Sequence, residues 1–157
     1  MNALLQLTEE ERGRGVVAFS SGNHAQGVAV AAARLGIKAR IFMPMGVALP
    51  KLAATRGHGA EVVLHGHNVD EALAEAQRYA DETGAVFVHP FDNTDIIAGQ
   101  GTVGLEVLEQ IPNVDTVVMG VGGGEMVRLT DVLSDSVCES DTVSACVFVG
   151  PPLSDPW

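Results

Sequence analysis

The chain alternates short apolar runs with helical patterns up to residue 121, and this alternation constrains the fold more than any other feature. We interpret the apolar runs 16–19, 39–43, 61–64, 86–89 and 116–121 as strands. The helical patterns cover residues 1–12, 24–35, 48–56, 69–82 and 95–110. Strands that are separated by helices of about 10–15 residues form parallel crossover units. The sequence therefore predicts an α/β fold with parallel sheets flanked by helices.

The composition argues against some classes of binding partner. The chain has 9 Lys and Arg against 20 Asp and Glu, a net charge of -11, which repels phosphate backbones and argues against a nucleic-acid partner. No apolar run reaches the roughly 18 residues of a membrane span, and no signal peptide is expected. The two cysteines, Cys138 and Cys146, form no CxxC pair, which fits a reducing, cytoplasmic compartment.

Two turns that follow strands carry the candidate site residues, because ligands on parallel sheets bind at the carboxyl ends of the strands. In the first, Ser20–His24, short polar residues surround Gly22 at the start of a helix. The free N–H groups of the first helical turn can hold a carboxylate or a phosphate. A well-capped helix without a ligand explains the same residues equally well.

The second turn contains Gly120, Gly122, Gly123 and Gly124 after the strand 116–121. Consecutive glycines expose N–H groups and form a nest for an anion. A plain glycine turn is one alternative. A dinucleotide site is another, but the third glycine and the acidic residue of that motif are missing.

The first turn, SSGNHAQG at 20–27, resembles the signature of the fold-type II enzymes that depend on pyridoxal 5'-phosphate (PLP). The resemblance is to threonine/serine dehydratases and serine racemases, of the tryptophan synthase β-like fold. It extends, in order and spacing, over the segments 2–10, 15–36, 51–66, 89–92 and 97–105, the last reading IAGQGTVGL. It implies a lyase of amino-acid metabolism that converts threonine or serine into a 2-oxo acid and ammonia. Serine racemase-type activity is the alternative within the family.

The resemblance also implies roles for residues. Ser20, Ser21, Gly22, Asn23, His24 and Asp92 would bind the amino acid substrate. Ser21 would be catalytic and handle protons, and Asn23 would bind PLP. Gly122, Gly123 and Gly124 would hold the phosphate of PLP. Here the chain departs from the family, because Glu125 occupies the place of a fourth glycine and its carboxylate would repel phosphate.

The family anchors PLP on a lysine that precedes the segment matching residues 1–5. Lys38 and Lys51 lack that context, so we expect this chain alone to be an inactive or weakly ligand-binding fragment. The resemblance further implies that 16–91 form a small mobile domain, and that 1–15 and 92–125 belong to a large PLP-binding domain. Residues 126–157 diverge as a tail in which 143–149 could be a strand.

Other candidate sites are weaker. His65 and His67, with His58 and His89, lack a cysteine or an acid to complete a zinc site, so we expect no metal. A hydrolase triad lacks the G-x-S-x-G elbow. Members of the family commonly form dimers, so the resemblance is compatible with a homodimer.

Overall fold

The computed structural model describes residues 1–114, 116–119 and 146–149. The chain forms two compact units, Met1–Pro90 and Phe91–Trp157, and each is described by itself. Within the described ranges, no helix combines the length and the hydropathy that crossing a bilayer requires.

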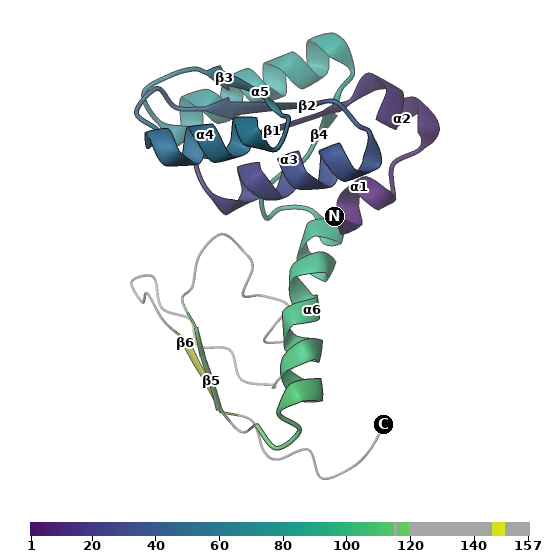
Figure 1. The fold of residues 1–157 in the computed structure, drawn as a ribbon, viewed down its shortest axis with the longest axis vertical. Helices are drawn as coiled ribbons and strands as arrows, with labels where there is room; N and C mark the ends of the chain where they lie inside the picture. The colour runs from purple at the N-terminus through teal and green to yellow at the C-terminus, as the bar shows by residue number, and fades with distance from the viewer. Residues whose placement is uncertain (115, 120–145, 150–157) are drawn as a thin grey trace. The chain divides into compact units, whose positions relative to one another are not determined.

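The N-terminal unit is built on a four-stranded parallel sheet in the order β3-β2-β1-β4 (Figure 1). Its strands are β1 (Val16–Phe19), β2 (Ala39–Met43), β3 (Glu61–Leu64) and β4 (Val86–Phe87). The first three have the predicted bounds, and the prediction of a parallel sheet flanked by helices is confirmed. The fourth is shorter than predicted. The Val88 carbonyl accepts a hydrogen bond from the His24 ring, and Pro90 has no N–H to offer to a ladder.

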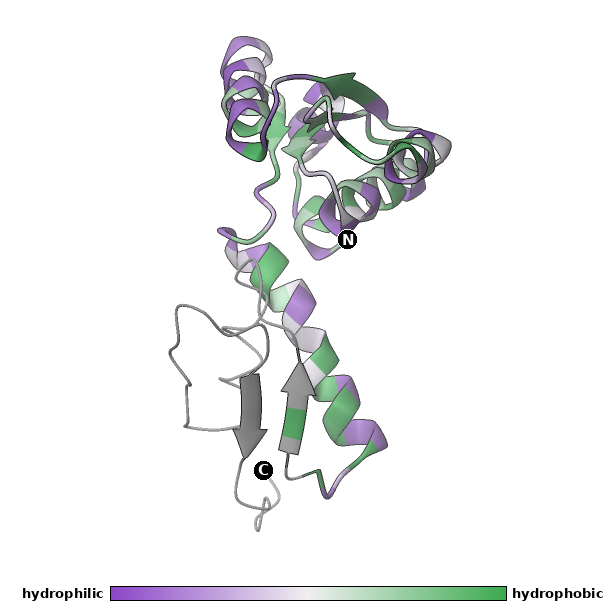
Figure 2. Ribbon diagram, turned by 90° about the vertical axis from the view of Figure 1, so that its left-hand side faces the viewer, coloured by the Kyte–Doolittle hydropathy of each residue, from purple (hydrophilic) through white to green (hydrophobic). Residues whose placement is uncertain are grey.

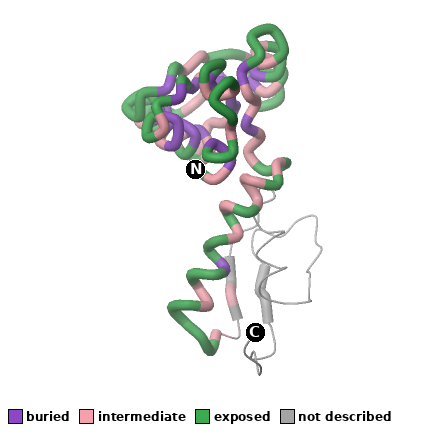
Figure 3. The backbone as a smooth tube through the Cα atoms, turned by 90° about the vertical axis from the view of Figure 1, so that its right-hand side faces the viewer, coloured by how far each residue is buried: buried purple, intermediate pink, exposed green. Residues whose placement is uncertain are grey.

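Helices cover both faces of this sheet. Helix α5 (Val69–Thr83) packs on one face, where Ala72 and Ala76 lie against a cluster that contains Phe19 and Phe42. Helix α3 (Asn23–Leu35) packs on β1 and β2 and also contacts α4 (Leu49–Gly57). Figure 3 shows that buried residues concentrate in the strands and in the inner sides of these helices. Small alanine side chains therefore let the helices lie close to the sheet.

The predicted single helix over 1–12 is wrong. The structure has two short helices, α1 (Asn2–Leu5) and α2 (Glu9–Arg14). Thr8 separates them, because its hydroxyl oxygen accepts from Glu11 N at 3.3 Å while its own N–H donates to Glu11 Oε2 at 2.8 Å. This reciprocal pair is a capping box, which starts a new helix at Glu9.

The C-terminal unit contains helix α6 (Thr94–Gln110) and an antiparallel pair, β5 (Thr116–Met119) and β6 (Cys146–Val149). Helix α6 confirms the prediction to within one residue at its start. Hydrophobic segments recur along it between hydrophilic ones (Figure 2). The proposed strand 143–149 is β6 over its last four residues. Residues 120–121 of the predicted strand 116–121 lie outside the described residues.

Candidate functional site

The carboxyl ends of three neighbouring parallel strands form one edge of the sheet. Ser20 follows β1, Pro44 follows β2 and His65 follows β3. Backbone hydrogen bonds join these turns: Ser20 N donates to Phe42 O at 3.1 Å, and His65 N donates to Met43 O at 2.8 Å. The sheet thus brings the predicted loop Ser20–His24 to the edge where ligands of parallel sheets bind.

The loop Ser20–His24 leaves the start of α3 open. Ser20 Oγ accepts a hydrogen bond from Gly22 N at 3.0 Å, which folds the turn back on itself. Gly22 is the residue before the helix, and no side chain of the described residues caps α3. A Cβ atom placed on Gly22 would meet nothing within 4 Å, so the space in front of the loop is open. The capped-helix alternative is therefore not the arrangement found, and the first N–H groups of α3 are free to bind an anion.

The His24 side chain anchors the loop to the sheet. Its Nε2 lies 3.0 Å from Val88 O, across 64 residues of sequence. Burial lowers the pKa of His24, the Val88 carbonyl opposes this effect, and the nearby His89 lowers the pKa further. The ring is therefore neutral at pH 7, with Nε2–H donating to Val88 O. His24 thus offers the site its backbone N–H, while its ring holds the helix start in place.

Three rings pack together next to the start of the Ser20–His24 loop. The rings of Phe19 and Phe87 stack with centroids 6.1 Å apart, and the His89 ring meets both edge-on at 5.9 Å. Such edge-to-face contacts stabilise a fixed arrangement of rings. Since Phe19 directly precedes Ser20, this cluster fixes the point at which the loop leaves the sheet.

A cavity of about 390 Å³ lies beside the loop at the same edge. It is lined by Ser21, Gly46, Lys51, His67 and Asn68, among others. The start of α4 at Leu49 and the start of α5 at Val69 both border it, and the Asn68 side chain caps α5 by accepting from Glu71 N at 2.9 Å. The sequence predicted no site role for Lys51, because Lys51 comes near Ser21 only through the neighbouring strands β2 and β1.

The predicted site residues divide into three groups. Ser20, Ser21 and Gly22 are partly exposed, while Asn23 is exposed at the start of α3. Asp92 is exposed and belongs to the second unit, between Pro90 and α6. Gly122, Gly123 and Gly124, with Glu125, lie outside the described residues. In the part of the chain that the structure describes, no group of three or more His, Cys, Asp or Glu could hold a metal ion.

Comparison with known proteins gives the site its context. Residues 1–128 match the family model described as pyridoxal-phosphate dependent enzyme. The L-threonine ammonia-lyase of Thermotoga maritima is 55% identical over 136 residues, which cover 87% of this chain and 34% of that protein. The catabolic L-threonine dehydratase of Escherichia coli is 45% identical over 80% of this chain and 38% of its own length. The structure of maize serine racemase has a TM-score of 0.79 and 35% identity, over 85% of this chain and 40% of that one.

The parallel sheet flanked by helices, with the loop at its carboxyl edge, defines an α/β protein of fold type II. This chain belongs to the pyridoxal-phosphate dependent enzyme family. It spans about a third of the length of the curated threonine ammonia-lyase and dehydratase relatives that it matches.

The described residues fit part of what a PLP enzyme needs. The open start of α3 and the space before Gly22 suit the carboxylate of an amino acid. Asn23, exposed beside these donors, has a side-chain amide that can donate to an oxygen of the cofactor ring.

Proposed function

We propose that this chain is part of a PLP-dependent ammonia-lyase that acts on L-threonine or L-serine and gives a 2-oxo acid and ammonia. The observation that carries the proposal is the Ser20–His24 loop, with an uncapped α3 and open space before Gly22 at the carboxyl edge of the sheet. The identity to threonine ammonia-lyases supports the same reaction.

Each residue of the loop has a distinct task in this proposal. The N–H groups at the start of α3 bind the substrate carboxylate, and the Ser20 side chain shapes the turn that presents them. Ser21 handles a proton at its hydroxyl, and the Asn23 amide orients the cofactor ring. PLP, when bound, supplies the electron sink that acidifies the Cα–H of the amino acid. Gly122, Gly123 and Gly124 would hold its phosphate, and Asp92 would lie near the substrate side chain.

The assignment of domains and surroundings is also a proposal. Residues 16–91 would form the small mobile domain, with 1–15 and 92–125 in the large domain and 126–157 as a divergent tail. We propose a cytoplasmic location, with which a chain of only two cysteines, Cys138 and Cys146, is consistent. Analytical ultracentrifugation of the chain would show whether it forms a homodimer.

The test uses a chimeric enzyme, in which a relative provides the parts of the protein that this chain does not contain. The matching segment of the T. maritima L-threonine ammonia-lyase is replaced by this chain's residues, and 2-oxo acid release from L-threonine and L-serine is measured. We expect activity, and we expect Asn23→Ala to lower kcat/KM by about tenfold or more, since a hydrogen bond to a charged group contributes about 1.5–3 kcal/mol. The control Arg34→Gln changes an exposed cation and should leave kcat/KM unchanged.

The outcomes separate the candidate functions. A folded, PLP-binding chimera that releases no 2-oxo acid from either substrate would refute the lyase proposal. Conversion of L-serine to D-serine without ammonia release would favour the racemase, the second candidate that the maize structure supports.

A third candidate is a non-catalytic ligand-binding fragment, and the position of Lys38 favours it for the 157-residue chain alone. Lys38 lies at the amino end of β2, at the opposite edge from Ser20–His24, whereas Lys51 lines the cavity beside Ser21. The chain is mixed with PLP, treated with borohydride and weighed by mass spectrometry. We expect no stoichiometric PLP adduct. A stoichiometric adduct on Lys51 would contradict the view that no lysine of this chain can take the cofactor.

A further inference from the structure

The cavity beside the Ser20–His24 loop, which we call the carboxyl-edge cavity, has two further walls. One is the segment 44–48 between β2 and α4, and the other is the turn 65–68 between β3 and α5. A backbone hydrogen bond joins the two walls, since Met45 N donates to Gly66 O at 2.9 Å. The shape of the cavity therefore depends on how firmly the turn 65–68 is held.

The Glu71 carboxylate, in the first turn of α5, holds this turn with both of its oxygens. Oε2 accepts a hydrogen bond from His67 N at 2.9 Å, and Oε1 accepts one from Asn68 Nδ2 at 3.0 Å. Gly66 has a φ of 73°, and a Cβ atom placed on it would collide with Glu71 Cβ. The Glu71 side chain therefore packs against the turn as well as accepting its hydrogen bonds.

Capping of α5 does not account for this arrangement. The Asn68 side chain already caps the helix by accepting from Glu71 N at 2.9 Å. In a capping box, the acidic side chain of the first turn accepts from the backbone N–H of the cap residue itself, which is Asn68 here. Glu71 instead reaches one residue further back, to His67 N. Its carboxylate therefore fixes the turn that precedes the helix.

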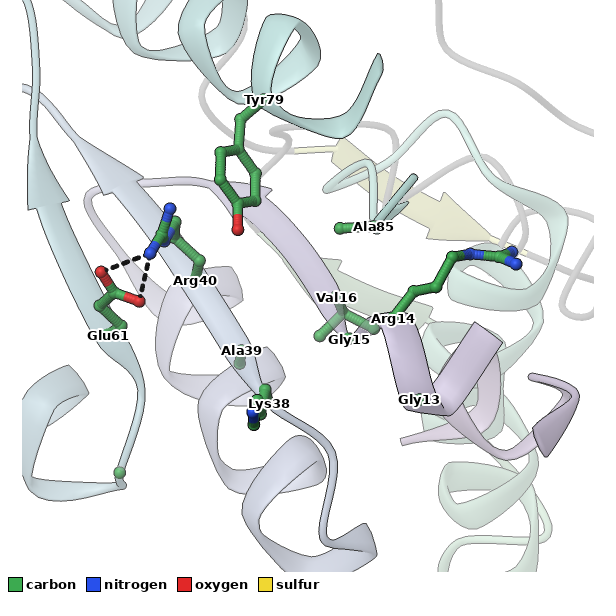
Figure 4. Close-up of a pocket in the computed structure, with 11 residues that line it drawn as sticks. Gly13, Arg14, Gly15, Val16, Lys38, Ala39, Arg40, Glu61, Tyr79 and Ala85 are labelled. Atoms are coloured by element: carbon green, nitrogen blue, oxygen red, sulfur yellow. Dashed lines mark hydrogen bonds and ion pairs between the residues drawn. The ribbon is translucent and has the colours of Figure 1, made fainter. Parts of the chain in front are cut away.

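Ion pairing does not account for it either. The ion pairs among the described residues join arginines to glutamates, which are Glu10, Glu61, Glu75 and Glu82. Figure 4 shows one of these pairs, Glu61 on β3 with Arg40 on β2, at the amino ends of the strands. Glu71 belongs to none of them, and its charge faces N–H donors of the turn. Hydrogen bonds to a charged acceptor are stronger than those between neutral groups, which suits a part that must stay in place.

We propose that Glu71 is a positioning residue for the amino-acid site. It holds the turn 65–68 and, through Gly66, the segment 44–48 in the arrangement that receives the substrate. Glu71 does not line the cavity beside Ser21, so it acts through the residues that do. When the turn is released, only a fraction of the molecules has the binding arrangement, and the apparent affinity falls by that fraction. The inference rests on the proposed function, because it assigns a task in substrate binding at that site.

The kinetic test uses the chimera with the T. maritima enzyme and measures kcat and KM for L-threonine. Glu71→Gln keeps one acceptor oxygen and replaces the other with an NH₂ group that faces a donor, so one hydrogen bond is lost. We expect KM to rise about fivefold, the size of one ordinary hydrogen bond, while kcat stays unchanged because no reacting group is altered. A variant that was merely less folded would lower the apparent kcat and leave KM unchanged.

Two further variants separate position from charge. Asp70→Asn is the matched control, since it removes the neighbouring carboxylate from the same first turn of α5, and KM should stay as in the parent. Gly66→Ala displaces the turn in another way, because its Cβ would collide with Glu71. It should raise KM too, and adding Glu71→Gln to it should raise KM little further, since both changes act on one contact.

Amide hydrogen exchange in the 157-residue chain gives a readout that needs no activity. Glu71→Gln should make the His67 amide exchange about fivefold faster, because its acceptor is weakened or lost. The Met45 amide should also exchange faster, since its acceptor is Gly66 O in the same turn. Asp70→Asn should change neither rate.

Three results would overturn the proposal. An active chimera in which Glu71→Gln has the KM of the parent would show that Glu71 serves the fold alone. An equal rise of KM in Asp70→Asn would assign the effect to charge. An unchanged exchange rate at Met45 would show that Glu71 does not hold the two walls together. A folded, PLP-binding parent chimera without activity would instead refute the proposed function, and the exchange at Met45 would then decide whether Glu71 holds the cavity.

Discussion

Replacing His24 with phenylalanine should destabilise the N-terminal unit by a predictable amount. The substitution keeps a ring of similar shape and removes the Nε2–H that donates to Val88 O at 3.0 Å. Val88 is 3% exposed, so water cannot readily replace the lost donor. A buried carbonyl left unpaired costs about 1–3 kcal/mol, and we expect a loss of that size in the free energy of unfolding at pH 7.5.

The same variant should also change the pH dependence of stability. Burial lowers the pKa of His24 in the folded chain below the 6.5 of a free histidine side chain, so the unfolded chain binds the proton more tightly. The parent chain therefore loses stability as the pH falls below 6.5, by at most about 1.4 kcal/mol per pH unit for one group. His24→Phe has no proton to bind at this position, so its stability should fall less steeply between pH 6.5 and the folded pKa.

Urea unfolding followed by circular dichroism at pH 7.5 and at pH 5.5 measures both effects. His58→Phe, the same chemical change at an exposed histidine, is the matched control and should leave the free energy of unfolding at pH 7.5 unchanged. If His24→Phe unfolds at the same urea concentration as the parent chain at pH 7.5 and shows the same dependence on pH, the His24–Val88 hydrogen bond does not stabilise the unit.

Two further substitutions probe the two edges of the sheet. Gly15→Ala should destabilise the chain by more than about 1 kcal/mol in urea unfolding, because Gly15 has a φ of 84° and a Cβ would lie 2.9 Å from Lys38 O. Gly13→Ala is the control, since a Cβ at Gly13 would meet nothing within 4 Å. Equal losses of stability in the two variants would contradict the clash at Gly15. Ser20→Ala removes the acceptor for Gly22 N, so the Gly22 amide should exchange its hydrogen about fivefold faster or more, as a lost hydrogen bond of about 1 kcal/mol implies; an unchanged exchange rate would show that Ser20 does not hold the turn.

The bounds of β1, β2 and β3 were predictable because each is a short apolar run with turn residues around it. For β1, Gly15 precedes the run and Ser20 and Gly22 follow it, so the sequence limits the strand to residues 16–19. The helices α3 and α5 followed from their alanine spacing. The carboxyl-edge position of Ser20–His24 then follows from the parallel sheet alone.

Other features could not be read in this way, for two different reasons. The break at Thr8 had a signal in the sequence, Thr8 and Glu11 at capping-box spacing, but three consecutive acids also suit a solvated helix face. The hydrogen bond from His24 to Val88 spans 64 residues and exists only because α3 begins beside β4.

The alanines of α5 limit which substitutions the interior of this unit can accept during evolution. Ala72 is 1% exposed and Ala76 is 0% exposed, and both lie in one cluster with Phe19 and Phe42. The volume of this layer is shared between small helix residues and large strand residues, and a close-packed interior conserves the total. A homologue with a larger residue at the position of Ala76 should therefore carry a smaller one at the position of Phe19 or Phe42, so these positions are expected to vary together rather than singly.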